Sequence, residues 1–79
     1  MYKHPMNYTK ENVSEIMNKP LKILITEYGS DNVIEEIDCE IINCLLASNH
    51  PYLPSSFRIK TEKGERNISV AEIKKFEDQ

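Results

Sequence analysis

Apolar and polar residues alternate over two segments in the C-terminal third of the chain. Phe57 and Ile59 are separated by charged neighbours, a period of two that is typical of a half-buried strand. Gly64 follows, and glycine readily adopts the positive φ that hairpin loops need. Because the alternation resumes after Gly64, the pattern predicts a hairpin over residues 56–70. A tight turn and a short last strand near Phe76 should complete it.

Two earlier segments are also expected to be extended. Residues 21–28 alternate in the same way, and a run of turn-forming residues follows them. In the long segment 33–46, residues 36–41 alternate between acids and apolar residues, and after residue 41 both faces are apolar. A helix is the alternative for 33–46, but its β-branched residues favour a strand. A strand of this length usually bends or bulges.

Residues 9–19 carry a different period. Val13, Ile16 and Met17 recur at i, i+3 and i+4, which would place them on one face of a helix. Pro20 cannot continue a helix. The pattern therefore predicts a short N-terminal helix over residues 9–19.

These elements predict a single domain over residues 1–79 of the α+β class, mainly β. Residues 1–8 form a flexible arm, and 9–19 the helix. Residues 20–77 form a small, five-stranded, strongly bent antiparallel barrel. Seventy-nine residues are near the lower limit for a self-sufficient core, so a deep, water-excluded active site is not expected.

The two cysteines bear on the cellular compartment. Cys39 and Cys44 are five residues apart, which in a regular strand puts their side chains on opposite faces and prevents pairing. The first nineteen residues lack the apolar run of a signal peptide, and no segment reaches transmembrane length. We expect reduced thiols, no membrane association and a cytoplasmic location.

Charge is concentrated in the middle of the chain. The net charge is −3, and residues 28–50 contain five acids and no Lys or Arg. An acidic strand face can bind a basic partner surface, although it can equally be a solvated face that prevents aggregation. The loop over residues 47–55 is rich in proline and projects several larger side chains. The candidate partner-binding residues are Glu35, Glu36, Asp38, Glu40, His50, Tyr52 and Leu53.

Other site chemistries are not favoured by spacing. Cys39, Cys44 and His50 do not fit a zinc motif. With only two glycines in the chain there is no phosphate-binding loop. Acids spread along one strand do not converge as a cation site requires. We expect no enzyme activity, catalytic residue, metal or cofactor. Four aromatic rings could form a stacking platform, namely Tyr28, His50, Tyr52 and Phe57.

The C-terminal segment GERNISVAEIKKFE resembles the end of small-barrel proteins of bacteria and phages such as the YolD-like family. In these proteins a hairpin strand is followed by a turn that Glu72-Ile73 and Phe76 match here. The order of elements over residues 10–77 resembles an Sm-like or SH3-like small barrel, a plan shared with the Rho-binding antiterminators. The glycine usual in the second strand of Sm-like proteins is absent, and residues 36–40 are acidic instead.

The resemblance implies a non-enzymatic adaptor or inhibitor that contacts another macromolecule. The leading hypothesis is a small interaction module, a regulator or inhibitor of the phage or mobile-element type. It would bind a host protein, such as a nucleic-acid-binding one, through the acidic strand face and the 47–55 loop. One alternative is direct binding of RNA or single-stranded DNA by Arg58, Lys60 and Arg66 with Tyr52. A second alternative is a homo-oligomeric structural component.

Overall fold

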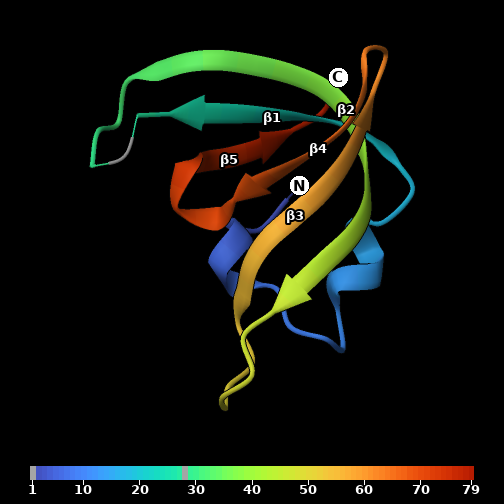
Figure 1. Cartoon of the computed structure of the whole chain (residues 1–79), viewed down its shortest axis with the longest axis vertical. Helices are drawn as coiled ribbons and strands as arrows, with labels where there is room; N and C mark the ends of the chain where they lie inside the picture. The colour runs from blue at the N-terminus through green and yellow to red at the C-terminus, as the bar shows by residue number, and fades with distance from the viewer. Residues whose placement is uncertain (1, 28) are drawn as a thin grey trace.

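Five antiparallel strands form one bent sheet in the computed structural model, which describes residues 2–27 and 29–79 (Figure 1). The sheet order is β4-β3-β2-β1-β5. The strands are β1 (Pro20–Thr26), β2 (Val33–Leu46), β3 (Pro54–Thr61), β4 (Gly64–Ser69) and β5 (Ile73–Glu77). Three short 3-10 turns complete the described structure, namely η1 (Pro5–Asn7), η2 (Val13–Ile16) and η3 (Val70–Glu72). The strand prediction for residues 33–46 is confirmed.

The predicted helix over residues 9–19 is wrong, and the fold is all-β rather than α+β. Only the single 3-10 turn η2 forms in this segment. The Asn12 side chain accepts a hydrogen bond from the Thr9 N–H at 2.6 Å, which competes with helical bonding of the backbone. Asn18 has a positive φ of 59°, and its N–H donates to the Ile41 carbonyl at 2.8 Å. An isolated helix of this length is marginal, so these contacts with other parts of the chain prevail.

The predicted five-stranded barrel is also wrong, because the sheet is open. β4 pairs only with β3, and β5 pairs only with β1. The 3-10 turn η3 lies between the two edge strands, and closure would require them to hydrogen-bond with each other in register. The flexible arm predicted for residues 1–8 includes Tyr8, which is 2% exposed. Its ring lies 6.0 Å from that of Phe76 on β5, so this part of the N-terminal segment is packed on the sheet.

The bend of the sheet is centred on β2. Its first half pairs with β1 and its second half with β3, and the register shifts between Ile41 and Asn43. Ile42 is therefore an extra residue, a β-bulge that changes which side chains face inward. As a result Cys39 and Cys44 both contact the core, so the prediction of opposite faces is wrong.

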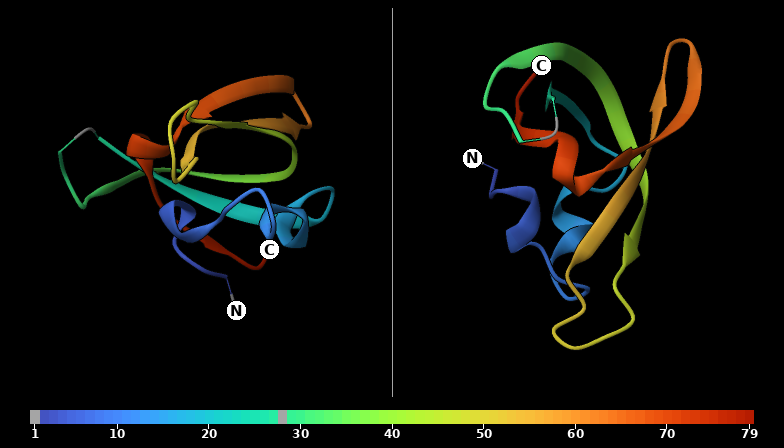
Figure 2. Two further views of the ribbon diagram at one scale, coloured as in Figure 1. Left: turned by 90° about the horizontal axis from the view of Figure 1, so that it is seen from below. Right: turned by 60° about the vertical axis from the view of Figure 1, so that its left-hand side comes forward.

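The core lies on the concave side of the bent sheet. Its largest fully buried side chains come from strands β1 to β4 and from the N-terminal segment, and they include Tyr8, Ile16, Leu21, Ile23, Ile41, Phe57, Ile59 and Ile68. The N-terminal segment lies on the side of the molecule away from the β3–β4 hairpin in both views of Figure 2. Met17 forms an isolated parallel bridge with Ile41, which fixes this segment against the bulge.

Candidate functional site

Three of the predicted acids project from one face of β2. Glu36, Asp38 and Glu40 are exposed, and they alternate with buried Ile37, Cys39 and Ile41. The prediction that residues 36–41 carry acids outward and apolar side chains inward is confirmed. We call Glu36, Asp38 and Glu40 the acidic row.

The acidic row is only partly neutralised by neighbouring strands. The Lys22 ammonium lies 3.6 Å from a Glu36 carboxylate oxygen, an exposed ion pair of small energetic value. Lys60 is opposite Glu40 in the strand register. Within residues 2–27 and 29–79, neither Asp38 nor Glu40 has a cationic group within 4 Å. Each of these two carboxylates thus has a lysine opposite it, Lys22 for Asp38 and Lys60 for Glu40, but forms no ion pair with it.

Glu35 is paired with an arginine of the β3–β4 hairpin. Its carboxylate accepts two hydrogen bonds from the Arg66 guanidinium, at 3.0 and 3.4 Å. Arg66 lies on β4, thirty-one residues further along the chain, and approaches β2 because the sheet is bent. The pair borders an open hollow of about 380 Å³ between β2 and the β3–β4 hairpin, which Glu36 and Asp38 also line. No local sequence signal identifies Arg66 as the partner of Glu35.

The predicted loop residues lie at the far end of β2 from the acidic row (Figure 1). The Ala47 N–H donates to the Leu53 carbonyl at 2.8 Å, which closes the loop. The His50 and Tyr52 rings meet edge to face with centroids 5.7 Å apart, and the Lys10 ammonium lies 5.4 Å from the Tyr52 ring centroid. The structure therefore brings His50 and Tyr52 together, but it separates both from the acidic row.

The proposed aromatic platform does not assemble from these residues. Phe57 is fully buried in the core, whereas Tyr52 is 40% exposed. Tyr28 lies outside the described residues. Of the predicted platform, the structure therefore brings together only Tyr52 and His50 among the described residues.

The two thiols are unpaired, and burial dominates their chemistry. Burial, with a contribution from the charges of Asp38 and Glu40, raises the pKa of Cys39 to about 11. Burial also raises the pKa of Cys44. Both thiols are consequently protonated at neutral pH and are poor nucleophiles. Across the described ranges, no cluster of three or more His, Cys, Asp or Glu residues has a geometry that could hold a metal ion.

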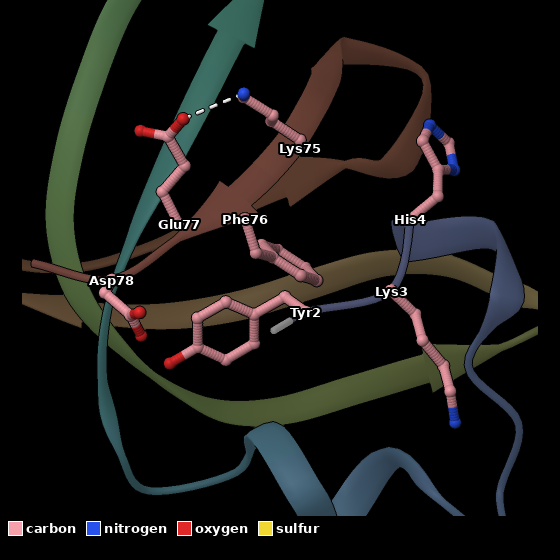
Figure 3. Close-up of a pocket in the computed structure, with 7 residues that line it drawn as sticks. All are labelled: Tyr2, Lys3, His4, Lys75, Phe76, Glu77 and Asp78. Carbon is pink, nitrogen blue, oxygen red and sulfur yellow. Dashed lines mark ion pairs between the residues drawn. The ribbon is translucent and has the colours of Figure 1, made fainter.

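Sequence reasoning did not anticipate a shallow hollow of about 400 Å³ between the N-terminal residues and β5 (Figure 3). Tyr2 and Phe76 meet edge to face there, with ring centroids 6.4 Å apart. The Lys75 ammonium and the Glu77 carboxylate form an ion pair of 2.9 Å at its margin. Burial and a hydrogen bond to Asp78 raise the pKa of the Tyr2 hydroxyl. The charges around this hollow are largely satisfied by one another.

Comparisons with known protein families, with curated proteins and with solved structures found no match for this chain. The resemblance to Sm-like, SH3-like and YolD-like proteins therefore stays a prediction. No helix in the described part of the chain is long and apolar enough to cross a membrane. What the fold defines is a small all-β domain with an open, bent sheet, and its function has to be argued from its surfaces.

Proposed function

We propose that the protein is a small, non-enzymatic interaction module that binds a basic surface of another protein through the acidic row. The observation that carries this proposal is the pair of exposed carboxylates on Asp38 and Glu40. They lie two residues apart on one strand face, and the described part of the chain offers neither of them an ion-pair partner.

Strand geometry favours this role over simple solvation. Residues i and i+2 on one strand face are about 7 Å apart, a spacing that matches neighbouring Lys or Arg side chains on a partner. Because Glu36, Asp38 and Glu40 lie on a strand that pairs with β1, little backbone entropy is lost on binding. Charge complementarity of this kind raises the association rate and the specificity more than the final affinity. Ile34, two residues before Glu36, is 60% exposed and can add apolar contact.

A partner that itself binds nucleic acid fits this chemistry. Carboxylates at the acidic row would occupy the positions of phosphate groups in a basic groove, so the module would act as a competitive inhibitor. The 47–55 loop, at the other end of β2, would then contact a separate part of the partner or take no part in binding.

Direct binding of nucleic acid is less well supported. The Arg58 guanidinium donates to Glu65 at 2.9 Å and to Asn67 at 3.2 Å. The Arg66 guanidinium is bound to Glu35. Binding phosphate would require both arginines to give up these contacts, so the protein-binding hypothesis is the one we retain.

The test is affinity capture from a lysate of the source cell, followed by mass spectrometry. The wild type is compared with a variant that carries E36K, D38K and E40K. We expect a stoichiometric partner whose recovery falls at least about tenfold in the variant, since unlike charges become like charges at the interface. Recovery by the wild type should also fall as salt is raised.

A matched control changes the net charge equally at exposed acids elsewhere, using E11K, E27K and E72K. This control should capture the same partner as the wild type. If the acidic-row variant captures the partner as well as the wild type does, the acidic row is not the binding surface and the proposal is wrong.

A further inference from the structure

The two edges of the open sheet differ in how well they are protected. β5 carries Lys74 and Lys75, its register with β1 shifts at Leu24, and residues 2–4 lie across the hollow beside it (Figure 3). Lysine and irregular pairing are common protections of an edge strand. β4 carries neither lysine nor proline, and its pairing with β3 has no register shift.

The free backbone groups of β4 have no partner in the described structure. In an antiparallel pair, alternate residues of an edge strand turn their N–H and C=O groups away from the sheet. Among residues 2–27 and 29–79, no loop or side chain forms a hydrogen bond with the backbone of residues 65–69. β4 also runs along the outer margin of the molecule in the left view of Figure 2. It therefore offers a regular, accessible template for strand addition.

The charges of β4 are already neutralised within the chain. Glu65 accepts from Arg58 at 2.9 Å, and Arg66 is bound to Glu35 at 3.0 Å. The other residues of β4, Gly64, Asn67, Ile68 and Ser69, are uncharged. A charged peptide would gain no electrostatic attraction at this edge. Each molecule has a net charge of −3, but on β4 both charged side chains are paired within the chain, so a second copy meets no unpaired like charge on this strand.

We propose that β4 is a homodimerisation edge, at which a second copy of this chain adds its own β4 in antiparallel pairing to give a continuous ten-stranded sheet. A two-fold axis perpendicular to the sheet relates the copies, so each contributes the same residues. One strand pair buries a small area, so the dimer is weak, with a Kd on the order of 10–100 μM. The acidic row lies on β2, separated from β4 by β3 in the sheet order, and Glu36 and Asp38 line the same hollow as Arg66.

Sedimentation velocity over protein concentrations from about 10 μM to about 1 mM tests this proposal, because the range brackets the Kd expected of so small an interface. The variant is N67K, which places a cation on the edge strand close to its symmetry copy. We expect wild-type protein to pass from monomer to dimer, and N67K to raise the Kd at least about tenfold.

The matched control is N43K. Asn43 and Asn67 flank Arg58 on its two neighbouring strands, so both variants put a lysine beside the same arginine. Only Asn67 is on the edge strand. N43K should therefore dimerise like the wild type, and a monomeric wild type at every concentration, or equal dimerisation of all three proteins, would overturn the proposal.

Hydrogen exchange on the wild type gives a second test that does not depend on the variants folding. The β4 amides that face outward should exchange more slowly at high protein concentration, since they become hydrogen-bonded in the dimer. Exchange of the β4 amides that is independent of concentration contradicts the proposal, whatever the acidic row binds.

Discussion

The two halves of β2 differ in which positions face the core: odd-numbered residues do so before the bulge, and even-numbered residues do so after it. From Glu36 to Ile41, acids face outward and apolar side chains face the core in strict alternation. Beyond the bulge at Ile42, Asn43 and the 52%-exposed Leu45 face outward, whereas Cys44 contacts the core. The comparison shows that one extra residue exchanges the positions that face the core and the solvent. The first half therefore presents charged side chains to solvent, and in the second half Cys44 still contacts the core.

The largest expected effect comes from deleting one residue in either half. Deletion of Asp38 puts neighbouring core residues on the outer face, and we expect a loss larger than the ~3–5 kcal/mol available to a domain of this size. Deletion of Ile42 removes only the extra residue of the bulge and leaves the facing of residues 43–46 unchanged. It should cost about 1–2 kcal/mol.

Far-UV circular dichroism with urea unfolding measures both deletions. The Asp38 deletion should be unfolded without urea, and the Ile42 deletion should unfold cooperatively at a reduced midpoint. Similar behaviour of the two proteins would show that the bulge does not separate the two halves in the way described.

A middle-sized effect is expected from the thiol in the first half. The pKa of Cys39 is raised from 9.0 to about 11 in the folded protein, so folding favours the protonated thiol. Its contribution to stability is complete below pH 9 and is lost as pH rises towards 11, a change on the order of 2 kcal/mol. In C39A, unfolding by urea should show a smaller decrease in stability over this pH interval.

C44A is the comparison for that measurement, because Cys44 lies beyond the bulge and burial raises its pKa as well. It should remove a smaller part of the decrease in stability at high pH than C39A does. An equal decrease in C39A and in the wild type would assign the pH dependence to other groups.

The smallest expected effect on stability comes from K22M, which removes the cation 3.6 Å from Glu36. Exposed ion pairs contribute little, so the free energy of unfolding should change by less than about 0.5 kcal/mol. Binding of a basic partner should instead become several-fold tighter at low salt, since the acidic row loses a competing cation. Titration of the captured partner measures this, and K19M, at an exposed lysine outside the acidic row, should leave affinity unchanged.

Strand positions could be predicted because burial on one side of a sheet imposes a period of two. Residues 36–41 follow that period without exception, and their facing was predicted correctly. The N-terminal segment shows the limit of this reasoning. Val13, Ile16 and Met17 have helical spacing, yet Asn18 is held by the Ile41 carbonyl, a contact that no pattern within residues 9–19 can reveal.

The candidate site was predictable residue by residue but not as an assembly. The exposure of Asp38 and Glu40 follows from alternation alone. The pairing of Glu35 with Arg66 depends on the bend of the sheet, which brings together residues thirty-one apart. The separation of His50 and Tyr52 from the acidic row depends on the length of β2 and on how it bends, and sequence spacing does not encode the bend.

The pairing of β1 with β5 has a consequence for how the chain acquires its structure. Lys22 is opposite Glu77, and Ile23 is opposite Phe76, so one side of β1 has no backbone partner until nearly the whole sequence is available. Such distant contacts slow folding, because the chain loses the entropy of closing a large loop before the contacts between β1 and β5 stabilise it. The antiparallel β1–β4 strands can pair in chain order first, and the other side of β1 is paired only when residues 73–77 join it.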